Sequence, residues 1–133
     1  MRVTAFYAAL LALLFLVLSF RTIGVRRARK VEIGDGGDKE LLRRMRVHAN
    51  FAEYVPIALI LMGAAETLAL APMALHGIGA TLLVGRITHA YALSQTPHVM
   101  PLRVFGMVAT FAAIIAGVVA CLGLSTGGLP FAP

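Results

Sequence analysis

Apolar positions gather in four long runs along the chain, and polar segments separate these runs. The runs are residues 3–20, 51–71, 72–94 and 104–124. At ~1.5 Å per residue, each is long enough to cross most or all of a hydrocarbon core ~30 Å thick. This pattern predicts an all-α integral membrane protein, one domain over residues 1–133 folded as a four-transmembrane-helix bundle. We place the spans at approximately residues 3–23, 40–70, 72–94 and 101–124.

The connections between the runs set the expected orientation. The first contains the basic segment VRRARK and the turn-rich segment IGDGGDKE, the second is only Ala71 and Pro72, and the third is SQTPHVMPLR. The first and third hold nearly all the Lys and Arg outside the runs, so the positive-inside rule places both in the cytoplasm and both termini outside. No small-x-small cleavage site follows the first run, which favours a retained anchor over a signal peptide. The tail GLSTGGLPFAP is too polar and too rich in Gly and Pro to continue the last helix.

Composition supports a membrane location and narrows the possible chemistry. Hydrophobic residues make up 59% of the chain and charged residues only 14%, against roughly a quarter in soluble domains. The net charge is +6, and nine of the twelve basic residues lie between Arg21 and Arg46. In so apolar a chain this cluster indicates a juxtamembrane loop, and no nucleic-acid partner is expected. The single Cys121 and the absence of an HExxH motif indicate neither a disulfide nor a metal site.

Polar side chains continue into the second run in the segment RRMRVHANFAEYVP. On a helix that begins near Lys39, Asn50 lies ~40° to one side of Arg46, and Glu53 lies ~20° to the other. His48 lies roughly 200° away, on another face. A charge this deep costs ~2.5–3.5 kcal/mol, so such residues face protein or water. Either these groups form structural pairs between helices or they line a site.

A second polar set favours a site. Arg86 and His89 share a helix face at i, i+3 spacing. Arg103 opens the fourth run, and Arg26, Arg29 and Lys30 end the first helix at the same membrane level. Cations from three helix ends therefore meet one carboxylate and one amide. This arrangement suits a small polyanion that carries one amino group.

Small residues recur at four-residue spacing and permit close helix contacts. They are Gly77, Thr81 and Gly85 in the third run and Ala109, Ala113 and Gly117 in the fourth. Four helices offer little interior of their own. We therefore expect an oligomer, although the spacing does not set the number of subunits.

The segment RVHANFAEYVP resembles the Arg-x-x-x-Asn-x-x-Glu-x-x-Pro signature of the MAPEG family, the membrane-associated proteins in eicosanoid and glutathione metabolism. GRITHAY, Arg103 and the basic end of the first helix extend the resemblance over nearly the whole chain. It is greatest to the small bacterial members, which implies a bacterial inner-membrane location. The resemblance also implies a homotrimer, with glutathione as co-substrate bound between neighbouring subunits near the cytoplasmic side.

Carried over by position, the resemblance assigns roles to individual residues. Arg103 faces the glutathione sulfur as the catalytic residue. The remaining site residues, which hold glutathione or lie beside it, are Arg26, Lys30, Arg46, His48, Asn50, Glu53, Arg86 and His89. A free thiol has a pKa of ~8.5, and a nearby guanidinium stabilises the nucleophilic thiolate. The thiolate then attacks a lipophilic electrophile or peroxide dissolved in the bilayer.

Three positions depart from the family pattern. A helix-three tyrosine is replaced by Leu93, with Tyr91 two positions early, a helix-four serine is replaced by Val104, and an arginine before the signature asparagine is replaced by Ala49. These departures argue against the specialised eicosanoid chemistries. The leading hypothesis is a glutathione transferase or peroxidase of broad specificity. The alternatives are a non-catalytic lipid-binding or scaffold member of the same fold and, less favoured, a small exporter.

Overall fold

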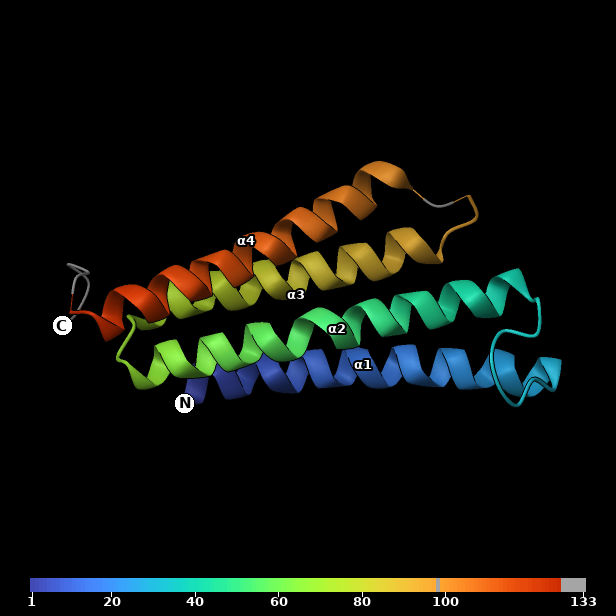
Figure 1. Ribbon diagram of the computed structural model, residues 1–133, viewed down its shortest axis with the longest axis horizontal. Helices are drawn as coiled ribbons and strands as arrows, with labels where there is room; N and C mark the ends of the chain where they lie inside the picture. The colour runs from blue at the N-terminus through green and yellow to red at the C-terminus, as the bar shows by residue number, and fades with distance from the viewer. Residues whose placement is uncertain (98, 128–133) are drawn as a thin grey trace.

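The computed structural model describes residues 1–97 and 99–127, and these form four antiparallel helices (Figure 1). The helices are α1 (Arg2–Arg29), α2 (Lys39–Thr67), α3 (Pro72–Ser94) and α4 (Met100–Ser125). The predicted all-α bundle is confirmed, and α2 begins at Lys39 as the sequence indicated. His98 and tail residues 128–133 lie outside the described residues.

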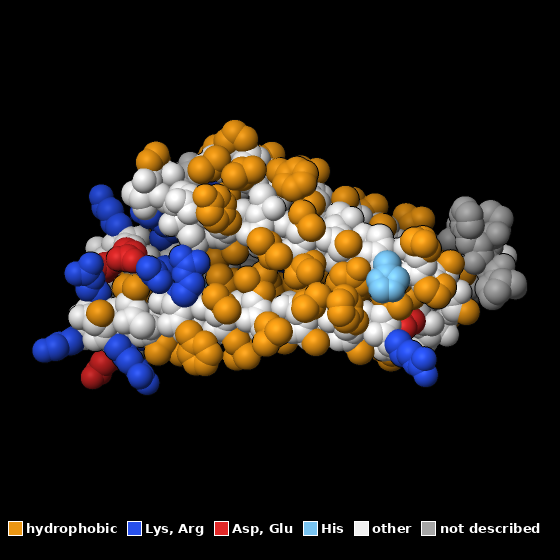
Figure 2. Space-filling model, turned by 180° about the vertical axis from the view of Figure 1, so that it is seen from behind, with side chains coloured by type: hydrophobic (Ala, Val, Ile, Leu, Met, Phe, Trp, Pro, Cys, Tyr) orange, Lys and Arg blue, Asp and Glu red, His pale blue; other side chains and the backbone are white. Residues whose placement is uncertain are grey.

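The antiparallel order places the first and third connections at one end of the bundle, and the N-terminus and the end of α4 at the other (Figure 1). We call the end with the first and third connections the basic end. Lys and Arg side chains gather mainly there, while hydrophobic side chains cover the middle of the face shown in Figure 2. The orientation predicted from the positive-inside rule assumes that the first and third connections lie on the same side, and the fold agrees with that assumption.

Helices α2 and α3 form the centre of the bundle. α1 packs against α2 and α3, α4 packs against the same two helices, and the described parts of α1 and α4 do not contact each other. The core includes the fully buried side chains of Leu11, Met62, Leu75 and Leu82. Polar groups on the central helices can therefore be enclosed from both sides. The candidate site lies among these groups.

Helix α3 carries polar side chains along its length. By length and composition, α1, α2 and α4 are apolar enough to span a membrane, whereas α3 contains His76, Arg86 and His89. Arg86 and His89 are only 1% and 3% exposed, so their side chains face neighbouring helices and not the lipid. These two side chains are thus compatible with membrane insertion, because protein covers them.

Carboxylates stabilise two helix N-termini in different ways. Asp38 caps α2, because its side chain accepts a hydrogen bond from the Leu41 N–H at 2.8 Å. Glu66, at the far end of α2, instead caps α1 by accepting from the N–H groups of Val3 at 2.9 Å and Thr4 at 2.8 Å. Glu66 therefore has structural partners within its own chain.

The loop carboxylate Asp38 makes a pH-dependent contribution to stability. The hydrogen bond from the Leu41 N–H and, secondarily, the charge of Arg29, whose Nε lies 3.0 Å away, hold the pKa of Asp38 below its ordinary value of 3.8. A lowered folded-state pKa stabilises the protein fully above the ordinary pKa, and this stabilisation is lost as pH falls through the lowered one.

We therefore expect Asp38→Asn, which keeps a capping oxygen but cannot ionise, to be less stable than the natural protein at neutral pH. The gap should close as the pH falls below 3.8. Thermal unfolding followed by circular dichroism across this range tests the prediction. A gap that stays constant with pH would contradict it.

The closest approach of α3 and α4 occurs at glycines. A Cβ atom on Gly106 would lie 2.7 Å from the carbonyl oxygen of Gly85 and 2.7 Å from the backbone N of His89. Gly85 belongs to the predicted stripe of small residues, whereas Gly106 lies outside the predicted stripes. A Cβ atom on Gly77, another member of the stripe in α3, would meet nothing within 4 Å. Gly77 therefore contributes no close contact within the described part of the chain.

Gly106→Ala should therefore lower the free energy of unfolding by about 1–3 kcal/mol or more, because backbone atoms must move to admit the methyl group. Gly77→Ala is the matched control. It should be neutral or stabilising by up to about 1 kcal/mol, since alanine is the better helix former. Thermal unfolding in detergent measures both, and equal midpoints for the two variants would refute the close contact.

Candidate functional site

A cavity of about 310 Å³ opens at the basic end between α2, α3 and α4. We call it the α4-side cavity, and its lining residues are Lys39, Leu42, Arg43, Arg46, Asn50, His89, Leu93 and Arg103. It brings together four of the residues that the sequence assigned to a site: Arg46, Asn50, His89 and Arg103. They come from three helices, α2, α3 and α4.

The charge of this cavity is strongly one-sided. Lys39, Arg43, Arg46 and Arg103 contribute four cations, and no carboxylate is among the lining residues. Clustered like charges beside low-dielectric walls raise the local concentration of the opposite ion. Guanidinium groups also bind carboxylates in two-point contacts. The cavity is therefore suited to an anionic ligand with more than one acidic group.

Arg86 is buried below this cavity, and its hydrogen bonds connect α3 to α2 and α4. Its Nη1 donates to Asn50 Oδ1 at 2.8 Å, and its Nη2 donates to the carbonyl oxygen of Gly106 at 3.4 Å. The guanidinium carbon lies 5.9 Å from the centre of the Tyr54 ring, a cation–π distance. Arg86 Nε has no hydrogen-bond partner among the described residues. The side chain of Asn50 thus connects the cavity wall to a buried positive charge.

Glu53 lies on the outer surface of α2, one turn beyond Asn50. Its side chain is exposed and makes no hydrogen bond or ion pair with the described part of the chain. The same outward stripe continues with Ile57 and Ile60, which are 46% and 65% exposed. An unpaired carboxylate facing lipid is costly. The described part of the chain leaves this face of α2 uncovered.

His48 lies on the opposite face of α2, as its helical phase indicated. Its Nε2 is 3.0 Å from Ser19 Oγ, and its ring lies 4.6 Å from that of Phe15 on α1. Within one chain, His48 therefore contributes to the α1–α2 interface and does not reach the α4-side cavity.

Arg26 and Lys30 also lie away from this cavity. Arg26 donates to the carbonyl oxygens of Val31, Glu32 and Gly34, and so holds the loop that follows α1. Lys30 is the C-cap of α1, in the left-handed conformation with φ 55°. Neither is brought near Arg103 within the chain, so a role for them at the site would have to come from another copy.

Two cations of the cavity were not among the residues that the sequence assigned to a site. Lys39 and Arg43 belong to the water-facing basic segment, yet they continue the stripe of Arg46 and Asn50 at helical spacing. Extending the helical phase back to the start of α2 would have found them. Leu93, which stands where the family pattern has a tyrosine, also lines the cavity.

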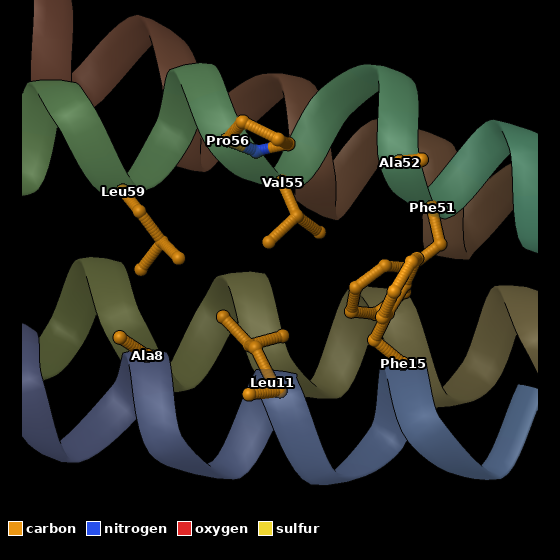
Figure 3. A pocket seen from close by; sticks show the side chains of 9 residues that line it. Ala8, Leu11, Phe15, Phe51, Ala52, Val55, Pro56 and Leu59 are labelled. Carbon is orange, nitrogen blue, oxygen red and sulfur yellow. The ribbon is translucent and has the colours of Figure 1, made fainter. Parts of the chain in front are cut away.

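A second, apolar groove of about 250 Å³ lies between α1 and α2 beside Pro56 (Figure 3). Its wall is formed by Ala8, Leu11, Ala12, Phe15, Phe51, Ala52, Val55, Pro56 and Leu59. Figure 3 shows Leu11, Val55 and Leu59 pointing into the space between the two helices. This groove has no charged side chain in its wall, so it is unsuited to a polyanion. A polyanion is better matched by the cations at the basic end.

Comparison with known proteins places the chain in a family. The model of the MAPEG family matches residues 4–123. The chain is 38% identical over 120 residues to the inner membrane protein YecN of Escherichia coli strain K12, and the match covers 90% of each chain. YecN of Escherichia coli O6:H1 strain CFT073 matches with the same identity and coverage.

The contact between Asn50 and Arg86 can be tested directly. Asn50→Ala should lower the free energy of unfolding by about 1–3 kcal/mol, because the buried guanidinium loses an acceptor. Asn50→Asp is the control, since it keeps an acceptor oxygen for Arg86. Thermal unfolding of both variants at neutral pH measures the difference. If the alanine variant is as stable as the natural protein, the hydrogen bond between Arg86 and Asn50 does not stabilise the fold.

Proposed function

The chain belongs to the MAPEG family, and from this premise we propose that it is a glutathione-dependent transferase or peroxidase of the bacterial inner membrane. Its substrates are lipophilic electrophiles or peroxides. The observation that carries the proposal is the α4-side cavity, which is lined by four cations and no carboxylate. Glu53 lies one helical turn from the lining residue Asn50 and has no partner among the described residues.

The groups around the cavity match the charges of glutathione. The tripeptide carries two carboxylates, one ammonium group and one thiol. Arg46, Arg43 and Lys39 supply cations for the carboxylates, and the carboxylate of Glu53 is available for the ammonium group. Asn50 is already oriented by its hydrogen bond from Arg86, so it can offer its amide N–H₂ to the peptide backbone.

Arg103 is proposed as the catalytic residue. It stands at the start of α4 and lines the cavity, where its guanidinium stabilises the thiolate of glutathione and remains protonated throughout. The thiol proton leaves to water. The sulfur then forms a bond to the electrophilic carbon, while the leaving group departs with its electron pair. Arg103 thus favours the reactive form of the co-substrate without itself exchanging a proton.

We further propose that the active assembly is a homotrimer with its basic end toward the cytoplasm. A neighbouring subunit would cover the outward stripe of Glu53, Ile57 and Ile60, which is exposed in the described part of the single chain. That neighbour could also bring its own Arg26 and Lys30 to the cavity. Binding between subunits explains why a single chain offers an incomplete site.

A non-catalytic lipid-binding role is the second candidate, and one observation favours it. Leu93 lines the cavity, and no hydroxyl-bearing side chain is among the lining residues. A thiolate bound in this cavity would therefore have the guanidinium of Arg103 but no hydroxyl group of a lining residue to stabilise it. Glutathione binding without a thiolate signal would favour this second candidate.

Titration of the purified protein with glutathione, followed through the ultraviolet absorbance of the thiolate, tests the proposed enzyme. Glu53→Gln should weaken binding at least about tenfold, since it removes the partner of the ammonium group. Arg103→Ala should retain binding but lose the thiolate band. Glu32→Gln, a charge change in the exposed first loop, is the matched control and should behave like the natural protein.

Two outcomes would refute the proposal. One is the absence of glutathione binding by the folded natural protein. The other is equal binding and an equal thiolate signal in Glu53→Gln, Arg103→Ala and the control.

A further inference from the structure

The basic end carries a second pocket, of about 330 Å³, on the side of α1. We propose that this α1-side pocket binds the phosphate headgroup of an anionic phospholipid. Its lining residues are Arg21, Lys39, Glu40, Arg43, Arg44, Val47, Ser94 and Thr96. They come from α1, α2, the end of α3 and the connection that follows it. The volume lies at the lower end of the roughly 300–1,000 Å³ found for small-molecule sites.

The pocket has a surplus of positive charge. Four of its lining residues are basic and only Glu40 is acidic. The Glu40 carboxylate is already engaged, with Oε1 2.7 Å from Arg44 Nη2 and Oε2 3.8 Å from Arg29 Nη2. Three net positive charges therefore face the pocket, and the one carboxylate is held by its cationic partners. Basic pockets at the membrane surface attract anionic headgroups by this electrostatic effect.

Two arginines of the pocket are held in place by the protein. Arg43 Nη1 donates to the carbonyl oxygen of Gln95 at 3.4 Å and to Thr96 Oγ1. Arg44 Nη1 donates to the carbonyl oxygen of Arg21 at 3.3 Å. Donors that are already positioned lose less conformational entropy when they bind a ligand. These contacts also connect α2 to α1 and to the connection after α3, so the pocket walls are fixed relative to one another.

The side chains of Arg21 and Lys39 complete the pocket. Both are exposed, and neither side chain makes a hydrogen bond or ion pair with the described residues. They are therefore available to a phosphate from the open side. Arg21 differs from Lys39 and Arg43 in one useful respect: it lines the α1-side pocket but not the α4-side cavity.

The position of Arg21 favours a lipid over a free phosphate ion. Arg21 directly follows the uncharged run of residues 3–20, so it lies where α1 passes from apolar to polar surroundings. Val17 and Leu13 precede it at four-residue steps on the same side of α1, and they are 52% and 61% exposed. A phosphate held at Arg21 would place its acyl chains along this exposed apolar stripe. A free ion would make no use of the stripe.

Lipid binding at this pocket can be tested separately from the proposed enzymatic activity, although Lys39 and Arg43 line both spaces. Arg21 has no assigned contact with glutathione, so a variant at this position separates the two proposals. The exposed Arg21 side chain also has no partner among the described residues, so its replacement should leave the packing of α1 intact. Circular dichroism checks this point, and Arg21→Lys keeps the charge if the glutamine variant proves unstable.

Native mass spectrometry of the detergent-purified full chain tests the proposal. The probes are dioleoyl phosphatidylglycerol, dioleoyl phosphatidylcholine with the same acyl chains, and inorganic phosphate. Phosphatidylglycerol should be retained at lower concentration than phosphatidylcholine. Arg21→Gln should weaken this retention about fivefold, which corresponds to ~1 kcal/mol for one basic residue near a membrane surface. Arg27→Gln, an exposed arginine of α1 outside the pocket, should leave retention unchanged, and Arg21→Lys should keep most of it.

Each other outcome would overturn the proposal. Equal losses in Arg21→Gln and Arg27→Gln would indicate general attraction to the basic end without a pocket. Equal retention of both lipids would mean that the headgroup is not recognised. Competition by inorganic phosphate that abolishes the preference for phosphatidylglycerol would assign the pocket to a free anion. In all three cases the glutathione titration would be unaffected and would still decide the enzymatic proposal.

Discussion

The charge of Arg86 must be accommodated inside an apolar bundle, and much of the architecture follows from how this is done. The guanidinium is 1% exposed and donates to Asn50 on α2 and to the carbonyl oxygen of Gly106 on α4. A buried charge without such partners would cost several kcal/mol. The contact at Gly106 is possible because α3 and α4 approach so closely there that a Cβ atom would collide with backbone. One residue on α3 thus donates hydrogen bonds to both of the helices beside it.

The two faces of α2 have different roles. His48 and Phe51 pack toward α1, where Phe15 lies within aromatic contact of both. Arg46, Asn50 and Glu53 point the other way, toward the α4-side cavity and the outer surface. Only Asn50 of these three has its side chain engaged within the described part of the chain, through Arg86. The proposed ligand and neighbouring subunit account for the two charged residues that the single chain leaves unpaired.

Much of the fold was available from sequence because it depends on local patterns. Apolar run lengths gave the four helices, and helical phase placed Arg46, Asn50 and Glu53 on one stripe and His48 on another. Partners distant along the chain were less accessible. Nothing in the sequence near Glu66 indicates that it caps α1, because this contact joins residues more than 60 positions apart. The close approach at Gly106 likewise depends on the register between α3 and α4. Arg26 and Lys30 were predicted from the family resemblance, and their relation to the site depends on a second subunit.

The proposed homotrimer places another copy of the chain against the polar stripe of α2. Native mass spectrometry of the protein extracted in mild detergent counts the chains in the assembly most directly. We expect a complex of three chains of 14.1 kDa each. A folded, monodisperse single chain would contradict it, because the unpaired carboxylate of Glu53 would then face lipid with nothing to offset its cost.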